Sequence, residues 1–250
     1  MTLSHTKKTH VRSQPLRIHR LLIFHILVLA VIIDNPASSA DFQRGLDAYH
    51  EGRYTTVLKE WLPLAEQGNA NAQLNLGLMY YNARGVSQNY KTAAKWLSLA
   101  AEQGHANVDA YYALALIYSN GWGTHQDYKA GVKWYSLAAE QGHADAQYNL
   151  ALMYSNGLGA PEDDKAAAKW LSLAAKQGHA GAQNSLGTIY FYGEGVRKDY
   201  LQAYMWFNVA VMNGSVDGAK SLNMVTKKMT STQVEQAKNL AHEWMKNHNK

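Results

Sequence analysis

A tryptophan-containing segment recurs along the chain at a nearly fixed distance, and this recurrence constrains the fold more than any other feature. The segment reads YKTAAKWLSLAAEQG at residues 90–104, and related segments occupy 128–142, 164–178 and 200–214. Intervals of 38, 36 and 36 residues separate their tryptophans. A period of this length is typical of arrays in which small units stack on one another. We predict core positions for these tryptophans and for two that lie about one period outside them, so that the set is Trp61, Trp96, Trp134, Trp170, Trp206 and Trp244.

Each repeat is predicted to contain two helices joined by a loop. In the repeat at 69–104, Ala72, Leu76 and Tyr80 recur every four residues, so they lie on one face of a first helix. A polar segment that contains Gly85 follows this helix and is predicted to be the loop. The fold class is therefore all-α, with antiparallel helix pairs stacked end to end.

The second helix of each repeat has recognisable ends. Asn89 is a favourable N-cap for a helix over residues 90–103, and Gly104 suits the left-handed residue that ends such a helix. The other copies keep a polar residue before the helix and a glycine after it. The residues expected in these roles are Asp127, Asp163 and Asp199 as N-caps, and Gly142, Gly178 and Gly214 as helix ends.

These marks divide the chain into units whose ends are atypical, as a stacked array requires. The first unit is shortened, and we expect its helices over 42–51 and 54–67. The last unit contains a helix over 220–228 and a second helix that begins at the capping box Thr230–Gln233. The predicted division is 41–68 for the short N-terminal repeat, 69–104, 105–142, 143–178 and 179–214 for the full repeats, and 215–250 for the C-terminal capping helices.

Residues 1–40 do not follow the repeat pattern. They contain a basic head, an apolar run of 13 residues at 21–33, and the small residues Ser38 and Ala40, which together indicate a secretory signal peptide cleaved before Asp41. An uncleaved N-terminal anchor is the alternative, although the apolar run is short for a membrane span. We therefore expect a periplasmic or secreted protein without stable membrane insertion after the leader is cleaved.

The formal net charge of +5 belongs mostly to this leader, which holds five of the 24 basic residues and one of the 19 acidic residues. The remaining body is close to neutral, and we expect no basic stripe on it. Nucleic acid is therefore not the expected partner, because binding to its phosphates requires clustered lysine and arginine. The chain contains no cysteine, which excludes disulfides and thiolate-ligated zinc.

The sequence shows no group of residues with the spacing of a catalytic motif. The S-x-x-K sequence at 4–7 lies in the leader, and the histidine–glutamate pairs lack the second histidine of a metalloprotease. His105, His143 and His179 follow the helix-ending glycines, but repeats ~10 Å apart are too widely spaced for three histidines to share one zinc ion. We expect these histidines to close the turns, and we expect no catalytic residue, no cofactor and no metal ion.

The repeats resemble the Sel-one-like repeat (SLR) family, which is related to tetratricopeptide repeats. The resemblance rests on the pattern A-x-x-x-L-G-x-x-Y at 72–80 and on the Gly-x-Gly loop. It rests also on the D-Y-x-x-A-x-x-W start and the A-A-E-Q-G-H-A junction, which are nearly complete at 127–144. It implies a right-handed α-solenoid that acts as an adaptor in protein complexes. The resemblance also implies that a bacterial member with a signal peptide acts in the envelope, in the regulation of signalling, or outside the cell against host proteins. A cysteine-rich branch is tied to β-lactam binding or hydrolysis, so the resemblance implies a cell-wall or β-lactam hydrolase as the alternative function.

Comparison of the copies within this chain points to a binding surface on the first helix of each repeat. Some positions are the same in every copy, whereas a second set varies among tyrosine, leucine and small polar residues, a mixture typical of protein-binding surfaces. We predict that this second set faces the concave side and binds a protein or peptide partner; the alternative is that it packs internally. The set consists of Asn71, Leu74, Leu78, Tyr81, Tyr112, Leu116, Ser119, Asp145, Tyr148, Leu152, Ser155, Asn184, Thr188 and Phe191.

Overall fold

The computed structural model describes residues 36–248, and all regular structure in that range is helical. Most of the predicted leader, residues 1–35, lies outside the described residues. The helices of the described range are α2 (Pro36–His50), α3 (Tyr54–Glu66), α4 (Ala70–Tyr81), α5 (Tyr90–Glu102), α6 (Val108–Asn120), α7 (Tyr128–Glu140), α8 (Ala144–Ser155), α9 (Asp164–Lys176), α10 (Ala180–Tyr192), α11 (Tyr200–Met212), α12 (Gly218–Thr226) and α13 (Ser231–His248).

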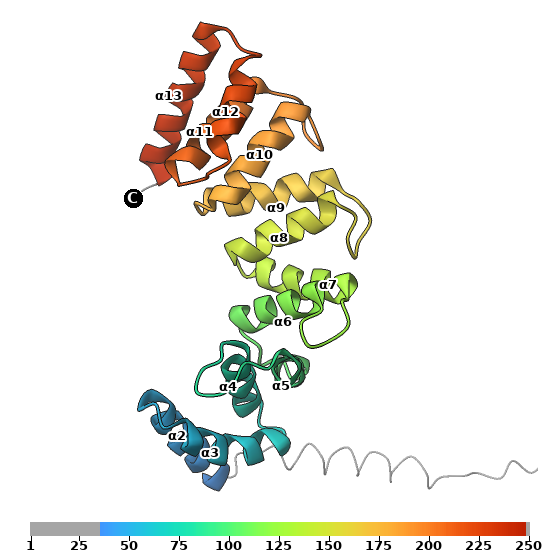
Figure 1. Ribbon diagram of the computed structural model, residues 1–250, viewed down its shortest axis with the longest axis vertical. Helices are drawn as coiled ribbons and strands as arrows, with labels where there is room; N and C mark the ends of the chain where they lie inside the picture. Colours follow the sequence, from blue (N-terminus) through green and yellow to red (C-terminus); the bar gives the residue numbers. More distant parts are fainter. Residues whose placement is uncertain (1–35, 249–250) are drawn as a thin grey trace, which may run out of the picture.

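Consecutive helices pack in pairs, and the pairs stack into a long array (Figure 1). We call α4, α6, α8 and α10 the A helices and α5, α7, α9 and α11 the B helices. Each A helix packs against the B helix that follows it and against the helix that precedes it. Because one pair alone cannot bury its apolar face, each pair depends on its neighbours for stability. The predicted all-α solenoid of stacked helix pairs is confirmed.

Hydrogen bonds confirm the predicted ends of the B helices. The side chain of each predicted N-cap accepts a hydrogen bond from the backbone N–H three residues later, at 2.9–3.0 Å; these residues are Asn89, Asp127, Asp163 and Asp199. The bonds satisfy N–H groups that have no partner within the helix. The glycines that follow the B helices all have positive φ values, which glycine adopts at low cost.

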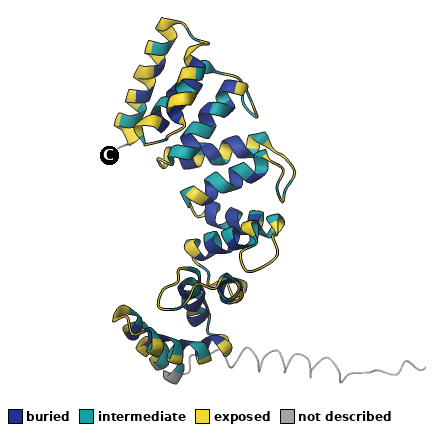
Figure 2. Cartoon of the chain, in the orientation of Figure 1, coloured by how far each residue is buried: buried dark blue, intermediate teal, exposed yellow. Residues whose placement is uncertain are grey.

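The buried residues lie on the helix faces that meet inside the array (Figure 2). Four of the six predicted core tryptophans are buried, with at most 8% of their surface exposed: Trp61, Trp96, Trp134 and Trp206. Contrary to the prediction, Trp170 and Trp244 are only half-buried, although both pack against the core cluster that contains Trp206. Trp244 lies on the last helix, where no further repeat covers it within the described residues, and Trp170 lies at the border between two core clusters.

Trp61 does not lie in the same row as the tryptophans of the full repeats. Counted from the glycine that ends each second helix, Trp61 occupies the position of Leu97 and not that of Trp96. The packing agrees, because a Cβ added to Gly45 would lie 2.2 Å from Trp61, just as a Cβ added to Gly77 would lie 2.6 Å from Leu97. A shift of one residue turns a helical side chain by about 100°, so an interval of nearly one period did not ensure an equivalent position.

Buried amides join successive helices in three of the four full repeats. Gln183 of α10 is fully buried, donates to the carbonyl oxygen of Ala175 at 3.0 Å and accepts from the amide of Asn213 at 3.0 Å. Gln73 and Gln147 make the same two kinds of bond in their repeats. A fully satisfied buried amide fixes the relative position of the three helices that it connects.

The repeat at 105–142 differs from the others at this position. It has Tyr111 in place of the glutamine, and the tyrosine ring stacks on Trp134 with ring centroids 5.9 Å apart. The same repeat has two extra residues before its A helix, in the segment 105–108. The junction between α5 and α6 therefore lacks the amide connection found at the equivalent junctions.

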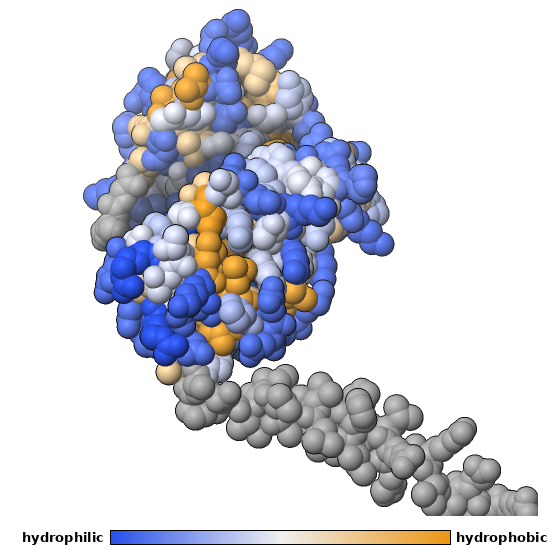
Figure 3. Space-filling model, turned by 60° about the horizontal axis from the view of Figure 1, so that its bottom comes forward, coloured by the Kyte–Doolittle hydropathy of each residue, from blue (hydrophilic) through white to orange (hydrophobic). Residues whose placement is uncertain are grey.

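The N-terminal helix is longer than predicted. It begins at Pro36 and not at residue 42, so it crosses the predicted cleavage position before Asp41. Within the described residues no repeat precedes α2 and α3, and Leu46 and Leu58 are half-buried. Seen from this end, the surface carries an apolar band bordered by hydrophilic residues (Figure 3).

The C-terminal cap agrees closely with the sequence pattern. Thr230 and Gln233 form the predicted capping box at the start of α13: the Thr230 hydroxyl accepts from the Gln233 backbone N–H at 3.2 Å, and the Gln233 side chain accepts from the Thr230 N–H at 2.9 Å. Helix α13 packs against α11. It thereby covers the B helix of the last full repeat, where another repeat would otherwise stack.

Candidate functional site

The predicted binding residues all lie on the A helices, and we call this set the A face. Most of them are half-buried, so each combines contact with the core and contact with solvent; Asn71 and Asp145 are exposed. The A helices α4 and α6 contact each other as well as their B helices. Closer approach of the helices on one side bends a solenoid towards that side, so the array bends towards the A helices at this junction.

Phe191 is an error in the predicted set. Its side chain is 9% exposed and belongs to a core cluster with Tyr204, Phe207 and Val225. The cause lies at the C-terminal end of the array, where α12 packs against α10 and α11 and covers this position. A partner could not contact Phe191 without displacing α12, so the A face as used below excludes it.

Two tyrosines of the A face stack on histidines of the following repeat. The ring centroids of Tyr112 and His143 are 4.3 Å apart, and those of Tyr148 and His179 are 4.5 Å apart. Both histidines are also N-caps, because Nδ1 of each accepts from a backbone N–H of the helix that it precedes, at 3.2 Å for His143 and 2.9 Å for His179. The prediction that histidines close these turns is confirmed for the two, and the stacking on the A face is an additional role that the sequence did not reveal.

The hydrogen bonds of His179 define its tautomer. Nδ1 accepts from the backbone N–H of Ala182 and therefore carries no proton. Nε2 lies 3.2 Å from Oδ1 of Asp145, so this nitrogen carries the proton and donates it to the carboxylate. One histidine thus connects the start of α10 with two A-face residues of α8, Asp145 and Tyr148.

A hollow of about 340 Å³ opens between α4 and α6 on the A face. Leu78, Tyr81 and Tyr112 of the predicted set line it. The structure adds Asn82 and Asp109, which sequence reasoning missed. A signal was present in the sequence, because Asp109 recurs as Asp145 in the next repeat and Asn82 recurs as asparagine in the next two repeats.

Burial keeps the tyrosine hydroxyl groups around this hollow protonated. It raises the pKa of Tyr81 to about 12, and the nearby Tyr112 and Tyr90 add to the rise. Burial is also the main cause of the raised pKa values of Tyr112 and Tyr135. These hydroxyl groups are therefore neutral at physiological pH, and the carboxylates supply the negative charge on this side of the molecule.

The raised pKa of Tyr81 predicts a loss of stability at alkaline pH. The unfolded chain loses the tyrosine proton near the ordinary pKa of 10, whereas the folded chain holds it to about 12. The stabilisation is therefore complete below pH 10 and should be lost as the pH rises towards 12. We expect Tyr81→Phe to make the free energy of unfolding less dependent on pH in this range, as measured by urea titration at pH 9 and pH 11. The exposed Tyr192→Phe is the control, and an unchanged slope in Tyr81→Phe would contradict the prediction.

Charge is distributed unevenly between the two kinds of helix. The four A helices contain no lysine or arginine, and their acidic residues are Asp109 and Asp145. Exposed lysines occupy two equivalent positions on each of three successive B helices: Lys91 and Lys95, Lys129 and Lys133, Lys165 and Lys169. The prediction that the body has no basic stripe is wrong, because near-neutral net charge concealed this separation between the two sides.

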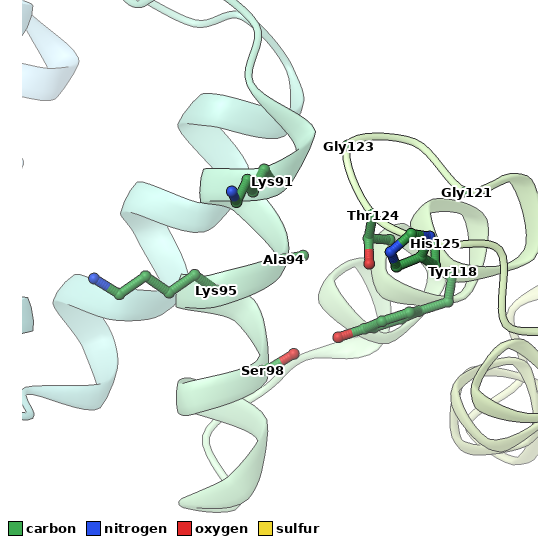
Figure 4. Close-up of a pocket in the computed structure, with 9 residues that line it drawn as sticks. All are labelled: Lys91, Ala94, Lys95, Ser98, Tyr118, Gly121, Gly123, Thr124 and His125. Atoms are coloured by element: carbon green, nitrogen blue, oxygen red, sulfur yellow. The ribbon is translucent and has the colours of Figure 1, made fainter.

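A second hollow, of about 660 Å³, lies between α5 and the loop that follows α6. Ser98 and Tyr118 direct their hydroxyl groups towards each other across it, whereas Lys95 extends away from Thr124 and His125 (Figure 4). The charged and polar groups of this hollow do not converge on a common point. It therefore lacks the geometry of a site that acts on one chemical group.

The described residues offer neither a metal site nor a membrane-spanning helix. Among residues 36–248, His, Asp and Glu side chains form no group of three that could hold a metal ion. No helix of the same range combines the length and the apolar character that a membrane-spanning segment needs.

Helix pairs that stack in succession and bury their faces against one another define a helical repeat protein of the α-solenoid class. The Sel1 repeat model matches residues 70–105, 108–143, 144–179 and 180–215. The chain belongs to the Sel1 repeat family. Proteins of this family are generally scaffolds for protein–protein interaction and typically non-catalytic. Among curated proteins, none matches this chain.

Two solved structures of Sel1 repeat proteins are similar to this chain. A protective antigen present in uropathogenic Escherichia coli strains is 35% identical, with a TM-score of 0.68, over 84% of this chain and 46% of the antigen. A Sel1 repeat protein from Oxalobacter formigenes is 37% identical, with a TM-score of 0.56, over 68% of this chain and 49% of the relative. The chain thus spans about half the length of each of these relatives.

Proposed function

We propose that this protein is an exported scaffold that holds a protein or peptide partner on its A face. The composition of that face carries the proposal, because it presents half-buried tyrosine and leucine side chains beside small polar groups, on helices without lysine or arginine. Such a mixture is typical of protein-binding surfaces. In a solenoid this surface continues over several successive repeats, so it can contact an extended ligand along its length.

The site of action that we propose is the bacterial envelope or the outside of the cell. It is supported by the signal-peptide pattern of residues 1–40, with its basic head, apolar run and small residues before Asp41. The relative from uropathogenic E. coli is a protective antigen, which is consistent with an exported member of the family. Envelope signalling and interaction with a host are the processes that such a scaffold would serve.

The proposal predicts that partner capture depends on the tyrosines of the A face. We expect the double variant Tyr112→Ala/Tyr148→Ala to retain about tenfold less of a specific partner than the wild type, because each truncation removes an aromatic side chain from the contact surface. The measurement is affinity capture from the cell's own envelope fraction on the immobilised protein, followed by quantitative mass spectrometry.

The matched control lies on the opposite side of the same repeat. Lys129→Ala/Lys133→Ala removes two exposed side chains of α7 and should leave capture unchanged. Thermal unfolding of both variants, followed by circular dichroism, verifies that the solenoid is intact. Capture that survives in the tyrosine variant and is lost in the lysine variant would place the partner on the B helices and contradict the proposal.

A further inference from the structure

We propose that the hollow between α4 and α6 is a binding site for one basic side chain, arginine or lysine, of the partner polypeptide. This inference rests on the proposed function, because it assigns a chemical class to what the A face holds. Four kinds of observation carry it: the shape of the hollow, the unpaired carboxylate in its wall, the aromatic rings around it, and its difference from the next junction.

The size of the hollow suits one side chain. Its volume of about 340 Å³ is at the lower end of the roughly 300–1,000 Å³ that is usual for small-molecule pockets. Leu78, Tyr81 and Asn82 line it from the end of α4, and Asp109 and Tyr112 line it from the start of α6. The apolar part can contact the aliphatic stem of a long side chain, while the carboxylate and the amide oxygen can accept hydrogen bonds from its charged end.

The Asp109 carboxylate has no basic partner among the described residues, whereas the equivalent carboxylate of the next repeat has one. Asp145 occupies the equivalent position in the next repeat and pairs with His179 at 3.2 Å. Within the described residues, no basic group lies within 4.0 Å of the Asp109 carboxylate. The lysines of the neighbouring repeats are on the B helices and not on the A helices. A basic side chain of a partner would therefore supply the counter-charge that this chain does not.

Two tyrosine rings complete the site. Tyr81 and Tyr112 both line the hollow, and the face of a tyrosine ring attracts a guanidinium or ammonium group. At the next junction, between α6 and α8, Ser119 takes the place of Tyr81, so the second ring is missing. The combination of a free carboxylate with two rings is thus specific to the junction that has the two extra residues at 105–108.

The test uses a minimal probe and the purified full chain labelled with ¹⁵N. We expect N-acetyl-arginine amide, added at millimolar concentration, to shift the backbone resonances of Asn82, Asp109 and Tyr112. N-acetyl-citrulline amide has nearly the same shape without the charge and should bind at least about fivefold more weakly, since loss of charge removes both the ion pair and the attraction to the rings. Asp109→Asn should weaken binding of the arginine probe by a similar factor.

Asp145→Asn is the matched control. Both aspartates lie in the first turn of an A helix, where a carboxylate favours the helix through its dipole, so a purely structural role predicts similar effects for the two variants. We expect binding of the arginine probe to Asp145→Asn to stay within about twofold of the wild type, because that carboxylate already has His179 as its partner.

The outcomes separate this inference from the proposed function. Equal binding of the arginine and citrulline probes, equal loss in the two aspartate variants, or no shifts at the hollow would each overturn the cation site. The capture experiment with Tyr112→Ala/Tyr148→Ala tests the scaffold function as a whole, because Tyr148 lies outside the hollow and Tyr112 lines it; Asp109→Asn in the same experiment tests the cation site alone. A partner lost in that variant and retained in Asp109→Asn would support a scaffold whose ligand carries no basic side chain at this position.

Discussion

Replacing Trp134 with alanine should lower the free energy of unfolding by about 3–5 kcal/mol, the usual cost of truncating a large buried aromatic side chain. The indole is 8% exposed, stacks on Tyr111 and belongs to the core cluster that joins α5, α6, α7 and α8. A domain has about 5–15 kcal/mol of stability in total, so the loss is large. Urea unfolding followed by far-UV circular dichroism measures it without relying on tryptophan fluorescence.

The matched control for this prediction is Trp122→Ala. Trp122 is 37% exposed and lies in the loop after α6, where it stacks on Tyr90. This side chain already contacts solvent, so its truncation removes less buried area than that of Trp134, and we expect a smaller loss of about 1–2 kcal/mol. Equal losses in the two variants would mean that Trp134 is not a core residue and that burial in the array does not depend on the repeated tryptophans.

Replacing Gly159 with alanine should lower the free energy of unfolding by about 2–4 kcal/mol, because two separate costs add at this position. Its φ of +76° disfavours any residue with a Cβ, and the Cβ itself would lie 2.2 Å from the carbonyl oxygen of Tyr128. That oxygen belongs to the start of the preceding B helix, which cannot move without disturbing the stack. The second glycine of the loop therefore permits the loop of one repeat to lie directly on the previous repeat.

Gly157 separates the two costs experimentally. It lies in the same loop with a φ of +62°, but a Cβ there would be 3.7 Å from its nearest neighbours, which is ordinary contact distance. Gly157→Ala should therefore show only the conformational cost of about 1 kcal/mol. The difference between the two variants, measured by urea unfolding under the same conditions, isolates the clash. A difference near zero would show that the loop relaxes away from α7 at little cost.

Local signals in the sequence predicted most of the helix ends correctly. Asn89 and the three aspartates that replace it are N-caps, and Thr230 with Gln233 forms the capping box. These features depend on hydrogen bonds between residues three positions apart, so a short window of sequence contains all the information. The start of α2 was placed six residues late, because the same residues also fit the end of a signal peptide.

The burial and the partners of individual side chains were harder to predict, because they depend on packing between repeats. Phe191 looked equivalent to Tyr81 in the repeat alignment, yet α12 covers it. The unpaired Asp109 and the paired Asp145 occupy equivalent positions in their repeats, and the structure alone distinguishes them. The separation of lysines from the A helices was visible in the sequence, but it became a property of two opposite sides only after the helices were stacked.

The sequence by itself determined that this chain is an array of helix pairs, where most of the helices begin and end, and which side chains repeat. Those properties follow from periodic burial and from hydrogen bonds within single turns. The tertiary structure decided which repeated residues meet, because the angle between successive pairs depends on how whole helix faces pack. Chemically similar positions therefore became the wall of a hollow at Asp109, a hydrogen-bonded carboxylate at Asp145 and a core residue at Phe191.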